Sequence, residues 1–247
     1  MKKRVSFITL GCKVNQYETN AMMQKFQENG YEIVEIDNVS DICVVNTCTV
    51  TNMSDRKSRQ ALRKVKDKNK DAIIVATGCY AQSSKEELEK MPEIDVVLGN
   101  EEKRDIVKYV EKYFEQNQKL TAVQDISVQK EFEDMGQISY TEKIRAVIKV
   151  QDGCNQFCSY CIIPYARGRV RSRHPEHIIK EIEKNDLREL KNNYFTEKNP
   201  ERFTHWELTY NNYFKIVGTY DQNVIEFDKI SDILNFIISL PVLSLFR

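Results

Sequence analysis

Cysteines are the residues of this 247-residue chain whose type and spacing point most directly to chemistry. Three of the seven, Cys154, Cys158 and Cys161, form a C-x-x-x-C-x-x-C loop directly after a strand-like run. A compact loop of this kind wraps three thiolates around one iron–sulfur cluster, and such clusters usually take four protein thiolates. Three ligands leave one iron open to a substrate or cofactor. The alternative is structural zinc, which normally needs a fourth ligand such as His174.

A second set of cysteines follows three separate strand-like runs. Cys12, Cys48 and Cys79 end the segments LGC, NTC and TGC. The carboxyl ends of parallel strands meet at one edge of a sheet, where ligands bind, so we expect these thiols to converge on a second cluster. Gly11 and Gly78 favour this interpretation, because a backbone without Cβ approaches a cofactor closely or makes a tight turn. The alternative is three small buried residues at strand ends.

The segments that must position these thiols alternate between strand-like and helix-like patterns. We expect strands at 4–10, 31–36, 42–46, 72–77 and 96–98, and helices at 17–28, 55–66, 85–90 and 103–113. Ser54 is the expected N-cap of the second helix. Because several strands are apolar on both faces, the pattern predicts a doubly wound α/β domain with a parallel sheet. Cys43 lies inside one strand and is expected in the core.

Four regions follow one another along the chain. Residues 1–115 form the expected α/β domain, and 116–141 form a polar linker that carries a strand at 121–123. Residues 142–184 begin a second α/β unit with a strand at 144–150, the cysteine loop and a helix that opens near Pro175. Residues 185–247 show no periodic element before 230–240.

Composition and charge exclude several classes of protein. Thirty-seven Lys and Arg balance 37 Asp and Glu, so a nucleic-acid partner must be held by a local patch, and the bulk charge predicts no partner. No run approaches the roughly 18 apolar residues of a membrane span, so no membrane partner is expected. We therefore expect a cytoplasmic protein, whose cysteines stay reduced.

The cysteine loop resembles that of the radical S-adenosylmethionine (SAM) superfamily, in which three such cysteines hold a 4Fe-4S cluster whose open iron binds SAM. The segments TLGCKVNQ (9–16), NTCTV (46–50) and TGCYAQ (77–82) are similar to signature segments of the methylthiotransferase family. Within it, GCKVNQ (11–16) and TVTN (49–52) followed by DRKSRQ (55–60) resemble most the threonylcarbamoyladenosine tRNA methylthiotransferases. The resemblance covers about residues 1–184.

The resemblance implies a reaction and its cofactors. Two 4Fe-4S clusters are implied: an auxiliary one that delivers sulfur, on Cys12, Cys48 and Cys79, and a SAM-cleaving one, on Cys154, Cys158 and Cys161. The implied enzyme adds a methylthio group to C2 of N6-threonylcarbamoyladenosine at position 37 of tRNA, with a flavodoxin-like or ferredoxin-like electron donor. The implied nucleic-acid partner is tRNA, and no DNA partner is expected. Tyr160 is placed near the SAM adenine; the alternative is an aromatic ring wedged beside a cluster.

Four alternating arginines follow the cysteine loop: Arg167, Arg169, Arg171 and Arg173. They form the only dense single-sign run near a cysteine site. We therefore expect contact with tRNA phosphates or with the SAM carboxylate. The alternative is a strand with one solvated, basic face.

The resemblance stops well before the end of the chain. Members of the family continue for well over a hundred residues beyond the loop, through a partial (β/α) barrel and usually a small RNA-binding β-barrel, whereas 86 residues follow Cys161 here. We expect 142–184 to form only the start of that barrel, and 185–247 to be a loosely packed segment of a truncated or out-of-frame product, weak or inactive alone. Two alternatives to the enzyme are a non-catalytic iron–sulfur-binding remnant or scaffold, and a zinc-dependent nucleic-acid-binding module.

Overall fold

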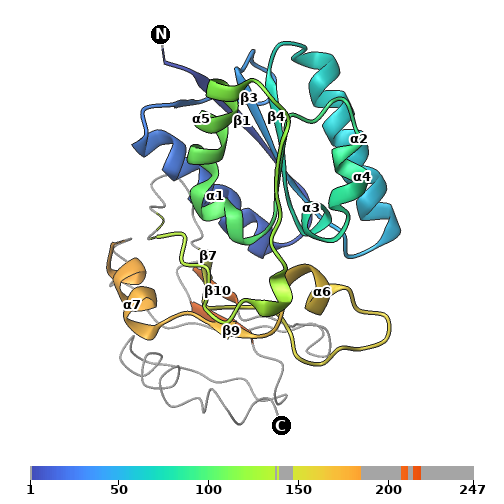
Figure 1. The fold of residues 1–247 in the computed structure, drawn as a ribbon. Helices are drawn as coiled ribbons and strands as arrows, with labels where there is room; N and C mark the ends of the chain where they lie inside the picture. Colours follow the sequence, from blue (N-terminus) through green and yellow to red (C-terminus); the bar gives the residue numbers. More distant parts are fainter. Residues whose placement is uncertain (1, 137, 139–146, 185–206, 211–213, 218–247) are drawn as a thin grey trace. The chain divides into compact units, whose positions relative to one another are not determined.

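The computed structural model describes residues 2–136, 138, 147–184, 207–210 and 214–217 (Figure 1). The chain divides into two compact units. The sheet unit consists of Met1–Gln129 with Phe157–Gly168, and the second unit of Lys130–Gln156 with Arg169–Arg247. Each is described by itself.

A six-stranded, wholly parallel sheet forms the centre of the sheet unit. Its order is β2-β1-β3-β4-β5-β6. The strands are β1 (Arg4–Thr9), β2 (Glu32–Ile33), β3 (Ile42–Thr47), β4 (Ile73–Gly78), β5 (Val96–Leu98) and β6 (Leu120–Ala122). Strand β6 lies in the segment expected to be a linker, and its bounds differ by one residue from those of the strand expected at 121–123. The α/β class predicted from the alternating pattern is confirmed.

Helices cover both faces of this sheet. Figure 1 shows α1 and α5 on one face and α2 and α4 on the other. The helices are α1 (Lys13–Glu28), α2 (Asn52–Lys68), α3 (Cys79–Ser83), α4 (Lys85–Glu89), α5 (Ile106–Gln116) and α6 (Ile163–Arg167), with 3-10 turns at Glu101–Asp105 and Ile126–Val128. The predicted cap Ser54 is wrong: α2 begins earlier, and the Thr51 hydroxyl accepts a hydrogen bond from the Ser54 amide.

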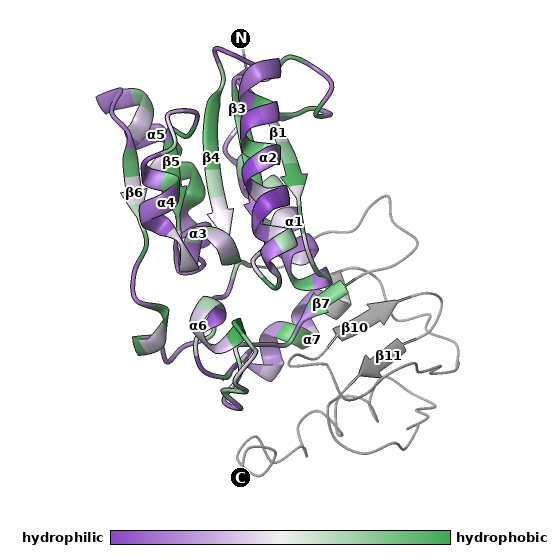
Figure 2. Cartoon of the chain, turned by 90° about the vertical axis from the view of Figure 1, so that its right-hand side faces the viewer, coloured by the Kyte–Doolittle hydropathy of each residue, from purple (hydrophilic) through white to green (hydrophobic). Residues whose placement is uncertain are grey.

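One hydrophobic core cluster lies between the central strands and α2. Every residue of β3 and β4 is buried, as continuous apolar runs in a doubly covered sheet require. Leu62 and Val65 pack there from α2, whose outward positions are charged. Figure 2 shows this division, with hydrophobic strands and largely hydrophilic helix surfaces. Cys43 belongs to this core, as predicted.

The second unit is built from short strands. Its elements are β7 (Val147–Lys149), β8 (Gln151–Asp152), β9 (Arg171–Ser172), α7 (Pro175–Lys184), β10 (Glu207–Tyr210) and β11 (Phe214–Val217). The strand, cysteine loop and helix occur in the predicted order. However, β7 pairs antiparallel with β10, which pairs antiparallel with β11, where no element was expected. No periodic element was expected before 230–240, so the sequence analysis missed both strands.

The remaining expectations for 185–247, including the element at 230–240 and loose packing, lie outside the described residues. In the described part of the chain, no helix has both the length and the apolar character needed to cross a bilayer.

Candidate functional site

The sheet unit brings Cys12, Cys48 and Cys79 to one edge of its sheet. Cys48 directly follows β3, Cys79 directly follows β4 and opens α3, and Cys12 is the N-cap of α1 after β1. These strands are neighbours and run parallel, so their carboxyl ends lie together. Cys48 and Cys79 are buried, whereas Cys12 is exposed. The topology therefore places one accessible and two buried thiols at the same edge.

The two glycines before these cysteines are needed for the turns. Gly78 has φ +97°, and a Cβ built on it would lie 2.5 Å from the carbonyl oxygen of Thr47. Gly11 has φ +98°, and its Cβ would lie 2.8 Å from the Sγ of Cys48. Only a residue without a side chain fits these positions. The chain itself occupies the space, which makes the tight-turn explanation the one that the geometry supports.

A buried asparagine, which the sequence analysis did not single out, ties the ends of β1 and β3 together. The side-chain amide of Asn15 donates to the carbonyl oxygens of Leu10, at 2.7 Å, and Thr47, at 2.9 Å. Asn46 donates in turn to the backbone oxygen of Asn15, at 2.9 Å. These bonds satisfy carbonyls at the strand ends that lead to Cys12 and Cys48.

Three buried charges lie in the same unit. Glu18, completely buried, forms an ion pair with Lys103, whose side chain is equally buried, and a second one with Arg167, at 2.8 Å from Nη1 to Oε1. Burial raises the pKa of the Cys79 thiol, while the positive charges of Arg167 and Lys103 act to lower it. A pair of cations around one carboxylate thus acts electrostatically on a thiol of the candidate site.

The loop cysteines are divided between the two units. Cys158 and Cys161 belong to the sheet unit, where the Cys161 amide donates to the Cys158 carbonyl oxygen at 2.9 Å, and Cys154 belongs to the second unit. None of the seven cysteines, all of them within the described residues, forms a disulfide. Over the described residues, no group of three or more His, Cys, Asp or Glu side chains is arranged to hold a metal ion. The two sets of thiols nevertheless supply the soft ligands that iron–sulfur clusters take.

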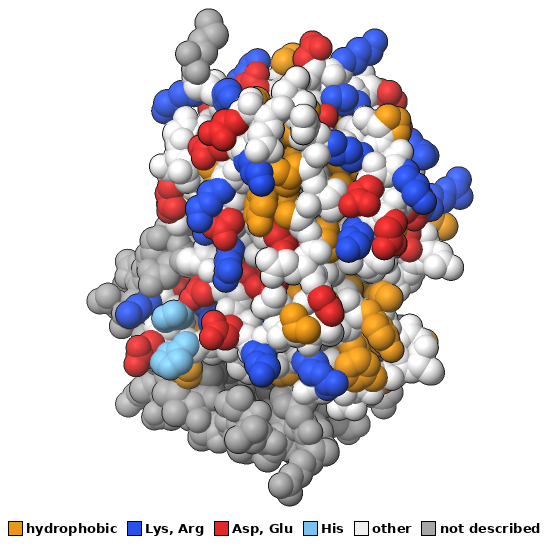
Figure 3. Space-filling model, viewed as in Figure 1, with side chains coloured by type: hydrophobic (Ala, Val, Ile, Leu, Met, Phe, Trp, Pro, Cys, Tyr) orange, Lys and Arg blue, Asp and Glu red, His pale blue; other side chains and the backbone are white. Residues whose placement is uncertain are grey.

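Aromatic side chains of the loop are open to solvent. Tyr160 is 89% exposed. Phe157 and Tyr165 are also exposed and meet edge to face, with ring centroids 5.8 Å apart. Figure 3 shows hydrophobic side chains on the surface of this part of the chain.

The four arginines do not share a solvated face. Arg167 lies in α6 and is buried, and only Arg169 is exposed. Within the second unit, Arg171 and Arg173 are buried: Arg171 lies 4.0 Å from Asp152, while Arg173 pairs with Glu181 and Asp134. The alternative of a strand with one solvated face is not met, because β9 contains only two residues and the three buried arginines each lie beside a carboxylate.

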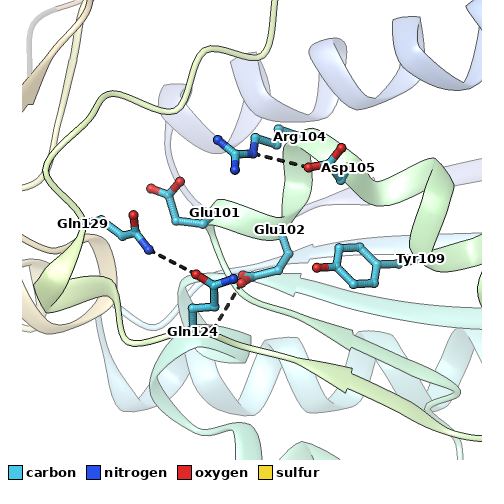
Figure 4. Close-up of a pocket in the computed structure, with 7 residues that line it drawn as sticks. All are labelled: Glu101, Glu102, Arg104, Asp105, Tyr109, Gln124 and Gln129. Atoms are coloured by element: carbon cyan, nitrogen blue, oxygen red, sulfur yellow. Dashed lines mark hydrogen bonds and ion pairs between the residues drawn. The ribbon is translucent and has the colours of Figure 1, made fainter.

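An acidic recess in the sheet unit is lined by residues from the segments that follow β5 and β6 in the chain (Figure 4). The residues that line it are Glu101, Glu102, Arg104, Asp105, Tyr109, Gln124 and Gln129. The Gln124 amide donates to Oε1 of Glu102 at 3.2 Å, while the other carboxylate oxygen has no hydrogen-bond partner among the described residues. Burial, the largest cause, raises the pKa of Glu102.

The raised pKa of Glu102 predicts a pH-dependent gain from Glu102→Gln. Ionisation costs more in the folded chain than in the unfolded one, so this contribution to stability is complete below the ordinary pKa of 4.5 and is lost as pH rises through the folded-state value. We expect the variant to match wild type near pH 4 and to exceed its free energy of unfolding at pH 7. Urea unfolding at both values measures this, with the exposed Glu86→Gln as control. An equal difference at both pH values would contradict the prediction.

Comparisons with known proteins match this chain to a family. Residues 4–99 match the model of the uncharacterized protein family UPF0004. The threonylcarbamoyladenosine tRNA methylthiotransferases MtaB of Aquifex aeolicus and Bacillus subtilis are 46% and 45% identical over 179 residues, which is 72% of this chain and 44% and 40% of those proteins. The ribosomal protein uS12 methylthiotransferase RimO of Clostridium novyi is 37% identical over 184 residues, 72% of this chain and 40% of that protein.

The chain thus spans less than half the length of these relatives. The matched segment contains the strand-end cysteines whose convergence the fold produces. Over this segment, the chain belongs to the methylthiotransferase family.

Proposed function

We propose that this chain carries the cluster-binding part of a tRNA methylthiotransferase that modifies C2 of N6-threonylcarbamoyladenosine. The observation that carries the proposal is the convergence of Cys12, Cys48 and Cys79 at neighbouring strand ends, in a chain that also has the three-cysteine loop. The names of the MtaB relatives support the choice of substrate.

Each set of three cysteines would hold one 4Fe-4S cluster, with Cys154, Cys158 and Cys161 as the set that leaves an iron open to SAM. When bound, the clusters and SAM supply the radical and the sulfur chemistry. The protein supplies ligation and exclusion of water. Burial of Cys48 and Cys79 keeps two ligands of the first set away from solvent, and Gly11 and Gly78 let their strands turn there.

Two of the residues predicted to contact substrates are exposed. Tyr160 exposes its ring for stacking on an adenine, the role predicted for it with SAM. Arg169 is the exposed arginine and the one proposed for contact with a tRNA phosphate or the SAM carboxylate, and Arg167, Arg171 and Arg173 form buried ion pairs. The proposal further includes a cytoplasmic setting and a flavodoxin-like or ferredoxin-like electron donor.

Reconstitution with iron and sulfide is the first test. Anaerobically reconstituted chain should hold about eight iron atoms, and replacing either set of three cysteines by alanine should leave about four. Cys43→Ala, in the core strand, is the matched control and should keep all eight. Stoichiometric zinc in a colourless protein would instead favour the zinc-dependent module.

Mass spectrometry of tRNA nucleosides tests the activity. In a strain that lacks the endogenous enzyme, this chain should restore the 2-methylthio nucleoside, at a lower level than a full-length relative because less of the protein is present to enclose SAM. Cys158→Ser should abolish it. If soluble, iron-loaded chain restores none, the non-catalytic remnant is the correct alternative.

A further inference from the structure

The helix that follows the cysteine loop is held against the edge of the first cysteine set. Helix α6 begins two residues after Cys161 and contacts α3, which starts with Cys79; all these residues belong to the sheet unit (Figure 1). The buried side chain of Asn100 donates to the Ala166 carbonyl oxygen at 2.6 Å. The backbone of α6 is therefore bonded to the segment that follows β5.

Arg167 extends this attachment to two strand ends. Its Nη2 donates to Oδ1 of Asn15 at 2.6 Å, and its Nη1 to Oε1 of Glu18 at 2.8 Å. Asn15 is the residue whose amide binds the carbonyls of Leu10 and Thr47, just before Cys12 and Cys48. One guanidinium thus connects the loop helix to the turns that carry two cysteines of the first set.

The surroundings of Arg167 favour an internal role over contact with RNA. Only 4% of its surface is exposed, and its guanidinium is bonded to protein oxygens. A planar fork that meets a carboxylate and an amide oxygen fixes direction as well as distance. Lys103 also pairs with Glu18, so the carboxylate keeps a cation when Arg167 is absent.

We propose that Arg167 is a positioning residue that fastens the segment with Cys158 and Cys161 to the sheet edge with Cys12, Cys48 and Cys79, through Asn15 and Glu18. The purpose of this attachment rests on the proposed function, because it would hold two ligands of the second set, Cys158 and Cys161, in one unit with the first set. The attachment itself requires neither cluster nor tRNA, so it is testable in the reduced, metal-free chain.

Alkylation of individual cysteines by a maleimide, followed by mass spectrometry, tests the proposal. Cys79 is buried where α3 meets α6, and Cys43 is buried in β3, so Cys43 reports on global unfolding. In Arg167→Gln we expect Cys79 to react at least tenfold faster and Cys43 at the wild-type rate. Loss of the cation removes an influence that lowers the pKa of Cys79, so acceleration requires opening of the structure and not a larger thiolate fraction.

Two further variants complete the experiment. Arg167→Lys keeps the charge but not the fork, and it should react at a rate between wild type and Arg167→Gln. Arg169→Gln removes an exposed arginine nearby and should behave as wild type. An unchanged Cys79 rate in Arg167→Gln overturns the proposal, and so does a parallel rise at Cys79 and Cys43, which would mean general destabilisation. Failure of the proposed function would instead appear as missing iron or missing methylthio nucleoside, with the alkylation pattern intact.

Discussion

Replacing Gly78 by alanine is expected to destabilise the sheet unit by about 2 to 6 kcal/mol, from backbone strain and overpacking together. Gly78 has φ +97° and ψ −167°, a region that residues with a Cβ essentially do not enter. The added methyl group would also lie 2.5 Å from the carbonyl oxygen and 2.7 Å from the amide nitrogen of Thr47. The contact can be relieved only if the strand end before Cys48 shifts. Because backbone atoms of a central strand have little room to move, this shift costs stability.

Gly30→Ala is the matched control for this prediction. Gly30 also has a positive φ, +83°, but a Cβ there would meet nothing within 4 Å. Only the conformational cost remains, about 1 kcal/mol. Urea unfolding of the metal-free chain, followed by circular dichroism, compares the two variants. Equal losses of stability would show that the contact with Thr47 is relieved by relaxation.

Removal of the Glu18 carboxylate is the second change with a large expected effect. Glu18→Gln leaves the charges of Lys103 and Arg167 buried without their shared counter-ion. Breaking a buried ion pair from one side typically costs about 3 to 5 kcal/mol, and we expect a loss in that range. By contrast, Asp105→Asn breaks the exposed pair with Lys108 and should cost less than about 1 kcal/mol.

A double-mutant cycle identifies the origin of that loss. If unpaired charge causes it, Lys103→Met should destabilise the Glu18→Gln chain less than it destabilises wild type, because the lysine then has no carboxylate to neutralise. Equilibrium unfolding of the four proteins at constant pH and salt gives the coupling free energy. A loss below about 1 kcal/mol in Glu18→Gln would contradict the prediction.

Local patterns were sufficient to predict the sheet and the position of the first cysteine set. Strands β3 and β4 are largely apolar runs. The cysteines directly after them therefore lie at the same edge of the sheet. The strand predicted at 31–36 is shorter, because β2 pairs with β1 over only two residues. Helix α3, which begins at Cys79 directly after β4, was not among the predicted helices.

The polar network around the site was not predictable in this way. Arg167 binds Glu18, 149 residues before it, and Asn15, 152 residues before it, and no short-range pattern encodes such a pairing. From the sequence, the alternating arginines were expected to contact tRNA phosphates or the SAM carboxylate, with a solvated strand face as the alternative. Three of the four are instead buried beside carboxylates. What each arginine contacts is decided by tertiary structure.

The sharing of Glu18 between Lys103 and Arg167 has a consequence for the order of events during synthesis. Lys103 leaves the ribosome 64 residues before Arg167. The central sheet can therefore close around a neutral pair while the cysteine loop is still being made. Arg167 then arrives as a second cation for a carboxylate that is already neutralised and oriented. Until Arg167 is made, the nascent sheet unit is thus protected from an uncompensated buried charge at Glu18.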